Sequence, residues 1–362
     1  MTEKKILYYT IGTELMPSSR ARVYVYRKSL ENSGLKVRII SAVSNGNCLA
    51  RIRRTNRGLR KIVFSVDAAL RLAFFIMSSF FYKTIVVQKI LFPVKLLSLV
   101  KILFRGKRVL FDIDDVVFVS HQDDAEIRDA GKSVKFIENM KLYSGILTST
   151  PHLNEMIAER FGIDRKSIVC VTDPVDTSVF HPDTGKEKDV IIGWIGTPSN
   201  TLYLEPCLRD LMKLADEGYS FRMLFCGADE KRVRSVIDSS IDCVFEKWSL
   251  EKEPSIYGGI SIGLMPLPDD LWSRGKGGYK LMLYMASGKI AVAGAVGINN
   301  EIALDGETAF LVHPGESWYD KIKYILDNYD SMDVLRKKAR NRIVDEYSLE
   351  RKVPEYISVL GF

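Results

Sequence analysis

The segment from Arg274 to Lys280, RGKGGYK, has the residue types of a phosphate-binding loop. Its glycines leave backbone N–H groups accessible, and its three basic side chains add positive charge beside them. A helix pattern follows directly, so the amides of a helix N-terminus would face the same anion. The sequence therefore predicts that Arg274, Lys276, Gly277 and Lys280 bind a diphosphate. The alternative interpretation is a solvated basic loop.

Two further glycine loops each join a predicted strand to a predicted helix. The first, IGTELMPSSRAR, contains Gly12, Thr13 and Arg20 at the point where a helix begins. The second, GWIGTPSN, contains Gly196 and Thr197 and has G-x-x-G spacing, which alone is weak evidence for a nucleotide site. Ordinary capping explains such loops equally well. We predict that these five residues contribute to the anion site.

An acidic cluster, FDIDDVVF at residues 111–118, follows an apolar run and is compatible with more than one function. Asp112 and Asp114 have the Asp-x-Asp spacing of haloacid-dehalogenase-type phosphatases, where they would act as nucleophile and acid/base with Mg²⁺. The spacing is also similar to the metal motif of single-domain glycosyltransferases, and a structural capping role is a third interpretation. At least three predicted strands precede the cluster, which disfavours the phosphatase because its motif should open the domain.

Candidate acid/base groups lie in and after this cluster. Asp114 and Asp115 are candidate catalytic acids, and His121 is a candidate acceptor-side base or substrate ligand. Glu301, in GINNE, is a candidate contact to the nucleotide or sugar, or else a helix cap. The four histidines and five cysteines are scattered without C-x-x-C spacing, so we expect no metal site and no cofactor.

Apolar runs alternate with helical patterns along the whole chain, which is typical of parallel βαβ units. A polar stretch at residues 181–189 divides the pattern into two halves. We therefore predict an α/β fold class, with two Rossmann-like domains at 1–182 and 189–345 whose parallel sheets face each other across a cleft. Open α/β sheets bind ligands at the carboxyl ends of their strands, where the glycine loops and the acidic cluster fall.

The formal net charge of +7 favours anionic partners such as nucleotides or an acidic membrane. The most apolar stretch, residues 72–82, is too short to span a bilayer, and a buried helix is the first interpretation. Residues 51–107 mix aromatic and basic side chains, which favours peripheral contact with an acidic membrane. The N-terminus has no signal-peptide pattern and no nucleic-acid-binding motif appears. We expect a cytoplasmic protein, peripheral on the inner face of the membrane.

Several motifs resemble the GT-B glycosyltransferases, specifically their large retaining group, family 4. DPVDTSVFHP at 173–182 is similar to the family's N-G-V-D-x-x-x-F-x-P segment, and IGWIGTPSN is similar to the opening of its nucleotide-binding domain. The stretch from GLMPL through KLMLYMASGKIAVAGAVGINNEIALDGETAFLV is similar to the family's core. Two acids that the family carries around this helix correspond to Gly275 and Leu283 here, and neither is acidic.

The resemblance covers nearly the whole chain and implies a function. It implies a nucleotide-diphosphate sugar as donor, a saccharide or lipid-linked acceptor, and a role in synthesis of cell-surface polysaccharide or glycan. It also implies retention at the anomeric carbon without a metal ion, and a C-terminal helix at 346–362 that crosses back to the first domain. Two alternatives stay open: a phosphatase that uses Asp112 and Asp114, or a catalytically degenerate partner subunit, which the missing acids favour.

Overall fold

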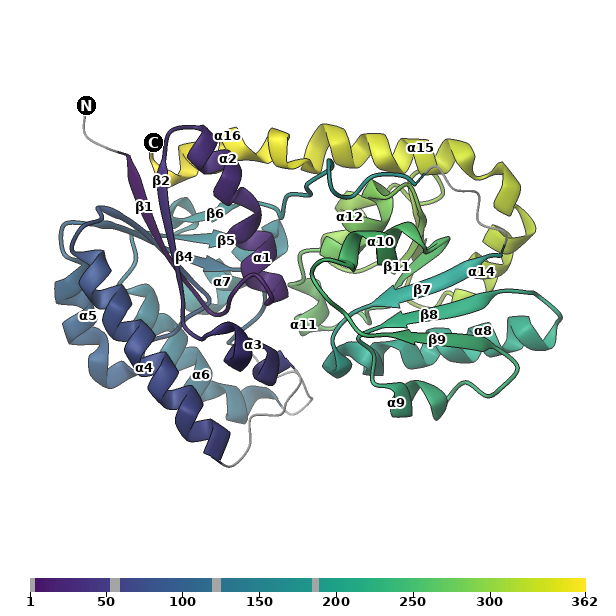
Figure 1. Cartoon of the computed structure of the whole chain (residues 1–362), viewed down its shortest axis with the longest axis horizontal. Coiled ribbons are helices and arrows are strands. Elements are labelled where there is room, and N and C mark those ends of the chain that lie inside the picture. Colours follow the sequence, from purple (N-terminus) through teal and green to yellow (C-terminus); the bar gives the residue numbers. More distant parts are fainter. Residues whose placement is uncertain (1–3, 53–58, 119–124, 184–188) are drawn as a thin grey trace. The chain divides into compact units, whose positions relative to one another are not determined.

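The computed structural model describes residues 4–52, 59–118, 125–183 and 189–362, which form two compact units (Figure 1). Unit 1 consists of Met1–Pro174, Gly275–Gly277 and Leu349–Phe362. Unit 2 consists of Val175–Arg274 and Gly278–Ser348. Each unit contains a six-stranded sheet in which every strand pairs in parallel with its neighbours. The predicted α/β class with two Rossmann-like parallel sheets is therefore confirmed.

The sheet of unit 1 has the strand order β2-β1-β3-β4-β5-β6. Its strands are β1 (Lys5–Thr10), β2 (Lys36–Ser41), β3 (Thr84–Gln88), β4 (Arg108–Ile113), β5 (Gly145–Thr148) and β6 (Ile168–Cys170). The register places Thr10 opposite Gln88 and Gln88 opposite Asp112. Polar side chains from three neighbouring strands therefore meet at one edge, because parallel strands end together.

Helices cover both faces of this sheet, and alternate residues of β1 point to opposite faces. One core joins Ile6 and Tyr8 to Tyr26 and the C-terminal helix, and the other joins Leu7 and Tyr9 to Phe75. The helices of the unit are α1 (Pro17–Arg22), α2 (Arg27–Asn32), α3 (Asn45–Ile52), α4 (Leu59–Ser79), α5 (Leu97–Phe104), α6 (Ala125–Met140), α7 (Pro151–Phe161) and α16 (Leu349–Leu360).

The sheet of unit 2 has the strand order β12-β11-β10-β7-β8-β9. Its strands are β7 (Ile191–Ile195), β8 (Arg222–Cys226), β9 (Asp242–Glu246), β10 (Ile262–Met265), β11 (Ile290–Gly294) and β12 (Phe310–Val312). The main helical segments are η4 (Pro198–Leu204), α8 (Glu205–Asp216), α9 (Glu230–Arg234), α10 (Glu253–Gly258), α11 (Leu271–Arg274), α12 (Tyr279–Ala286), α13 (Asn299–Ile302), α14 (Trp318–Asp327), α15 (Asp333–Arg342) and η6 (Ile343–Tyr347). Helix α12 has its side chains from Leu281 to Ala286 buried in the core of this unit.

Residues 175–182, which the sequence assigned to the first half, make their contacts in unit 2. The amide of Val175 donates to the carbonyl of Tyr347 at 2.8 Å, and the Phe180 ring packs edge-on against Tyr257 at 5.6 Å between centroids. The guanidinium of Arg340 donates to the carbonyl oxygens of Phe180 and Thr177. The segment before the polar stretch is thus part of the fold of unit 2.

The prediction of a buried helix at residues 72–82 is wrong. Phe74, Met77 and Phe81 are exposed to 43%, 59% and 77%, although Phe75 between them is fully buried. The apolar segment also begins earlier than residue 72, since α4 starts at Leu59. By length and composition alone, Arg60–Ser79 is a helix that can cross a membrane, and it is the one such helix among the described residues.

Candidate functional site

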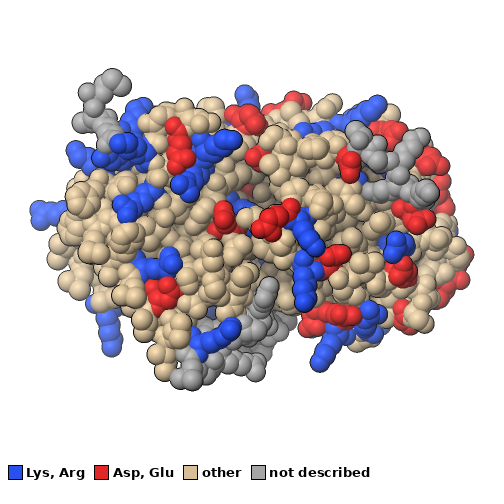
Figure 2. Space-filling model, viewed as in Figure 1, with Lys and Arg blue, Asp and Glu red and all other residues tan. Residues whose placement is uncertain are grey.

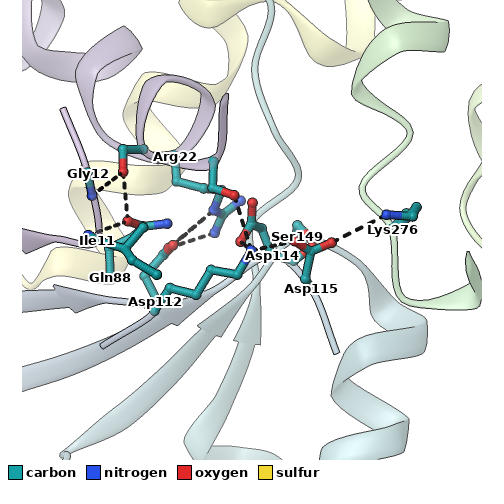
Figure 3. Close-up of polar contacts among 12 residues, drawn as sticks. Ile11, Gly12, Arg22, Gln88, Asp112, Asp114, Asp115, Ser149 and Lys276 are labelled. Carbon is teal, nitrogen blue, oxygen red and sulfur yellow. Dashed lines mark hydrogen bonds and ion pairs between the residues drawn. The ribbon is translucent and has the colours of Figure 1, made fainter. Parts of the chain in front are cut away.

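Four aspartates gather beside the carboxyl ends of β4 and β6 in unit 1 (Figure 3). They are Asp112, at the end of β4, Asp114 and Asp115 just after it, and Asp173 after β6. Two cations from other elements meet them: Arg22 at the end of α1 and Lys89 directly after β3. The acidic cluster that the sequence singled out is therefore already paired with positive charge.

Arg22 is held between two of these carboxylates. Its side chain is 1% exposed and lies 2.8 Å from Asp112 and 3.0 Å from Asp173. Both oxygens of Asp112 accept N–H bonds from the guanidinium, and the carbonyl of Thr148 accepts another at 3.3 Å. A guanidinium stays charged when buried and presents donors in a fixed fork, which suits it to this position.

The same contacts contradict the phosphatase interpretation. The Asp112 side chain is fully buried, and each of its oxygens receives a bond from Arg22. A carboxylate nucleophile needs an exposed oxygen that faces the phosphorus atom. Asp112 has none, so it stabilises the fold of unit 1 instead of attacking a substrate.

Asp173 has a carboxyl whose pKa lies near neutral. Burial raises the pKa of its carboxyl to about 7, although the charge of Arg22 partly offsets that effect. Gly277 lies against this carboxyl: a Cβ built on it would be 2.6 Å from the Asp173 Oδ2 and 3.5 Å from the Ser149 Cβ. A larger residue does not fit, so glycine is required here for close approach. An anion near Gly277 would be repelled less when Asp173 is protonated.

Lys89 links the other two aspartates. Its ammonium group is 2.9 Å from Asp114, also contacts Asp115, and donates to the Ser18 hydroxyl at 3.1 Å. Burial lowers the pKa of Lys89, but Asp114 and Asp115 outweigh it, so the net shift is upward. Within the described residues Lys89 is the one non-glycine with positive φ, at 60°. Such backbone strain persists where the surroundings fix the residue in place.

Lys276 is the sequence-predicted cation that joins this cluster. The segment Gly275–Gly277 belongs to unit 1, and the Lys276 ammonium lies 3.8 Å from Asp115, a contact that Figure 3 draws as a dashed line. Of the predicted catalytic acids, Asp114 therefore pairs with Lys89, and Asp115 pairs with both Lys89 and Lys276.

The loop after β1 is tightly folded, and its amides have partners. The Gly12 amide donates to the Ser19 hydroxyl at 3.2 Å, and a Cβ on Gly12 would lie 2.8 Å from the Met16 Cβ. The guanidinium of Arg20 donates to the Glu14 carbonyl at 3.1 Å. Gly12 is thus needed for packing, and its N–H is used inside the loop, contrary to the prediction that it approaches a ligand. The buried Thr13 hydroxyl has no partner within the described part of the chain.

The second predicted loop, after β7, is also explained by packing. The Gly196 amide donates to the Cys226 carbonyl at 3.0 Å, and a Cβ on Gly196 would lie 2.4 Å from the Trp194 ring. Thr197 precedes η4 as its N-cap, and its hydroxyl is 3.0 Å from the Ser199 hydroxyl. The predicted role of Gly196 as a phosphate donor is therefore wrong, because its N–H is already bonded.

The turn into α12 keeps the geometry expected of an anion site. Gly278 has φ of 68°, and a Cβ there would lie 2.3 Å from Ile302 Cδ1, so only glycine fits. As the N-cap of α12, Gly278 provides no side-chain acceptor for the first helical amides. Lys280 in the first turn places its ammonium 4.9 Å from the centre of the Trp194 ring.

Three other sequence-predicted positions have clear places in the structure. Arg274 pairs with Asp269 through contacts of 2.5 and 3.0 Å, so part of its charge is already neutralised. Glu301 has an exposed side chain on α13, and its carbonyl accepts from Arg342 at 2.7 Å. Leu283 is 1% exposed inside the core of unit 2. His121 lies outside the described residues.

Sequence reasoning missed Lys89 and Asp173 as members of the site. Each has a weak signal in the sequence: Lys89 follows the buried run TIVVQ, and Asp173 precedes a proline directly after SIVCVT. Charged residues at the carboxyl ends of parallel strands are candidates for a ligand site. Their partners come from distant segments, which the strand pattern does not predict.

This chain is similar to a protein family and to several solved structures. Residues 189–328 match the model of a family described as glycosyl transferases group 1. A search of curated protein sequences finds no match. Among solved structures, a glycosyltransferase from Rickettsia africae ESF-5 has a TM-score of 0.71 at 15% identity, covering 99% of this chain and 98% of that one.

Two further structures are similar over their whole length. Sucrose-phosphate synthase from Thermosynechococcus elongatus has a TM-score of 0.70 at 14% identity, covering 98% of both chains. Anabaena HepE, in complex with UDP and glucose, has a TM-score of 0.68 at 13% identity, covering 99% of both chains. These likenesses show that the fold is that of the GT-B glycosyltransferases.

The family match and the structural likenesses cover different parts of the chain. Residues 189–328, which match the glycosyl transferases group 1 model, include the RGKGGYK segment and α12. The resemblance expected from the sequence is thereby confirmed for this part of the chain, and the solved structures show the same fold over its whole length.

Proposed function

We propose that the chain transfers a sugar from a nucleotide-diphosphate sugar to a saccharide or lipid-linked acceptor in the synthesis of a cell-surface polysaccharide or glycan. The glycosyl transferases group 1 domain at residues 189–328 supports the reaction class. A structure of the same fold, HepE, was solved with UDP and glucose, which supports a nucleoside diphosphate as the leaving group.

The observation that carries the proposal is the turn into α12. Gly278 has a backbone conformation and a close neighbour that only glycine tolerates, and the helix after it starts without a side-chain cap. Lys280 is the second residue of α12, so its side chain starts from the same turn as the first amides of the helix. Such a helix start attracts phosphate because its amide dipoles and a cation act on the same anion.

The chemistry follows from this placement of charge. The bond between the anomeric carbon and the phosphate oxygen breaks, and the acceptor oxygen forms a bond to that carbon as its proton leaves. The departing nucleoside diphosphate gains negative charge, which the amides of α12 and Lys280 stabilise. In this proposal the amides and Lys280 fill the role of a metal ion, and the anomeric configuration is retained, as in family 4.

The reaction also needs a residue that accepts the proton of the acceptor hydroxyl. Asp114 pairs with Lys89, and Asp115 pairs with both Lys89 and Lys276. Asp173 has a pKa of about 7, which suits proton transfer at neutral pH. We therefore propose Asp173 as an acceptor-side base alongside the earlier candidate His121.

Binding and turnover of the donor test this function directly. UDP, GDP, ADP and their sugars are each added to the purified chain, and the melting temperature and sugar transfer are measured. A nucleotide at 100 times its dissociation constant should add about 2.7 kcal/mol to the free energy of unfolding. If no nucleotide raises the melting temperature and no donor is consumed, the proposal is wrong.

The Lys280→Ala substitution tests the diphosphate site. Loss of one charge-assisted phosphate contact, about 1.5–3 kcal/mol, should lower kcat/KM for the donor by about ten- to a hundredfold. Stability should change by only about 0.5–1 kcal/mol, from the lost contact with Trp194. Lys337→Ala, an exposed lysine on α15, is the control and should keep full activity. Full activity of Lys280→Ala would remove Lys280 from the site.

A partner-subunit role is the second candidate, and Leu283 favours it. The family's acid at that position is replaced by a side chain buried in the core of unit 2. A partner subunit would bind a nucleotide without transferring or hydrolysing the sugar. Nucleotide-dependent stabilisation together with no turnover across saccharide and lipid-linked acceptors would identify it.

A further inference from the structure

Helix α4 turns apolar side chains toward solvent. Seven exposed large hydrophobics lie in α4 and two more, Phe80 and Phe81, follow it directly, with exposures from 38% to 77%. The polar residues Asp67 and Arg71 lie instead on the side that packs against unit 1, where they bond to one another at 2.8 Å. This is the reverse of a surface helix in a soluble α/β unit, whose polar face is outermost.

The spacing of these residues makes one continuous band. At about 100° per residue, Ile62, Val63, Val66, Ala69, Leu70, Ala73, Phe74, Ile76, Met77, Phe80 and Phe81 all fall within roughly 160° of the helix circumference. All of these residues are exposed. An apolar band of this width on a helix normally faces a partner, because single exposed hydrophobics are common but a contiguous patch is not.

The neighbouring helix α5 and the turn before it continue the band. Val94 in that turn is exposed to 51%, and Leu99 and Ile102 in α5 are exposed to 65% and 71%. The Lys107 ammonium, after α5, lies 5.3 Å from the centre of the Phe80 ring, so the ends of the two helices are adjacent. Figure 2 shows the surface over α4 and α5 as mostly tan, with blue basic side chains at its border. We call these exposed hydrophobics of residues 62–102 the α4–α5 face.

The charge around the α4–α5 face is mainly positive. Residues 59–111 contain ten Lys and Arg and a single acid, Asp67. Two of the ten lie away from the face, because Arg71 pairs with Asp67 and Lys89 pairs with Asp114 and Asp115. Arg60, Lys61, Lys95 and Lys101 are exposed beside the apolar side chains. A partner that covers this face must therefore offer apolar groups and negative charge together.

The contacts of α4 with the sheet favour a helix that lies on such a partner and does not cross it. Asp67 accepts from the Ser44 amide and the Asn47 side chain, both at 2.7 Å. Phe75 is fully buried and stacks on Tyr9 of β1 at 4.2 Å between ring centres. Withdrawing the helix into a bilayer would break these bonds and expose the core of unit 1, which is costly.

We propose that the α4–α5 face docks on the surface of an anionic lipid bilayer. The apolar side chains of α4 and α5 enter the boundary between headgroups and acyl chains, while the lysines and arginines around them contact lipid phosphates. Basic amphipathic helices bind membranes in this way, with about 1 kcal/mol, or about fivefold in affinity, from each cation near the surface. The proposal does not depend on the sugar-transfer reaction, since it uses no residue of the donor site.

Vesicle flotation of the full chain tests this docking. The chain should float with vesicles of phosphatidylcholine containing about one-third phosphatidylglycerol, and far less with phosphatidylcholine alone. Binding should weaken at high salt because the Debye length falls to about 3 Å at 1 M. Equal flotation with neutral vesicles, or none with either kind, would overturn the proposal.

Charge substitutions on the face separate docking from folding. Leu70→Glu with Met77→Glu, at positions exposed to 67% and 59%, should lower the vesicle affinity at least tenfold. The double variant Lys95→Glu with Lys101→Glu should lower the vesicle affinity by a similar factor, because it changes the charge of the face by four units. The matched controls are Val334→Glu, 66% exposed on α15, and Lys337→Glu beside it, both of which should bind normally.

Two outcomes with these variants would show that the face does not dock on a membrane. Unchanged flotation of both α4–α5 variants, with melting temperatures equal to that of the original chain, would exclude a membrane contact through this face. Self-association in light scattering that Leu70→Glu abolishes, without flotation of the original chain, would assign the face to a second copy of the chain. Either result overturns the proposal.

Discussion

Arg22 holds one positive charge between two buried carboxylates, Asp112 and Asp173. One cation cannot fully compensate two ionised acids in a site of low dielectric, so one acid retains its proton to a higher pH. Asp112 has the denser bonding to Arg22, with three contacts of 2.8–3.2 Å, whereas Asp173 has one side-chain bond at 3.0 Å. The raised pKa of about 7 at Asp173 agrees with this difference.

This titration predicts a particular pH dependence of stability. Between pH 4 and 7 folded Asp173 keeps its proton while the unfolded residue loses it. Its contribution to the free energy of unfolding therefore falls as pH rises through this range, by about 1.4 kcal/mol for each pKa unit, and is constant above it. The Asp173→Asn variant lacks this titrating group. The difference between its free energy of unfolding and that of the original chain should therefore rise from pH 5 to pH 8. Urea unfolding at the two pH values measures this difference.

The control for this experiment is Asp330→Asn, an exposed aspartate in unit 2. Its stability relative to the original chain should stay the same at both pH values. An unchanged relative stability of Asp173→Asn between pH 5 and pH 8 would mean that Asp173 is already ionised in the folded protein at the lower pH. Asp173 would then also be a poor candidate for proton transfer.

At the scale of elements, α16 is the clearest case of a helix that owes its place to packing. It is the last helix of the chain, yet Leu349, Tyr356 and Leu360 are buried in the core of unit 1 with residues of β1 and α2. The ring of Tyr356 stacks on Tyr26 at 4.1 Å between centroids. Pro354 lies inside the helix, so its own backbone bonding is weaker than usual.

The stacked ring of Tyr356 should contribute much of the free energy that holds α16 in unit 1. Tyr356→Ala is expected to destabilise unit 1 by about 3–5 kcal/mol, because it leaves a cavity where a buried aromatic side chain was. Tyr356→Phe keeps the ring and should cost far less. Unfolding followed by far-UV circular dichroism measures both. Equal losses for the two variants would show that the hydroxyl, not the ring, holds the helix.

On the scale of the whole molecule, the two units do not correspond to the two halves of the sequence. Unit 1 is assembled from three separate segments, and its final segment, Leu349–Phe362, follows the whole of unit 2 in the sequence. Unit 1 is therefore complete only when residues 349–362 have been made. All four tryptophans, Trp194, Trp248, Trp272 and Trp318, lie in unit 2, so their fluorescence reports on that unit alone.

Removal of residues 349–362 should thus affect one unit more than the other. Deleting α16 uncovers Tyr26 and Leu30, so the circular dichroism transition that belongs to unit 1 should move to lower urea concentration. The tryptophan fluorescence transition of unit 2 should keep its midpoint. A common shift of both signals would show that the two units unfold as one cooperative body.

The candidate site could be predicted from the sequence only in part. Glycine and basic residues between a strand and a helix identified the turn into α12, because a local pattern specifies that turn. The same reasoning failed for Gly12 and Gly196, whose amides bond to Ser19 and Cys226. A glycine that packs closely and a glycine that binds a phosphate look alike in a sequence.

By itself, the sequence determined the alternation of strands and helices, and with it two parallel sheets, since hydrophobic periodicity is a local property. Only the tertiary structure decided which charges meet: Arg22 is 90 residues from Asp112 and 151 from Asp173. It also decided that the apolar band of α4 faces outward. Periodicity tells which residues share a side of a helix, but the sheet against which the helix packs determines which side is covered.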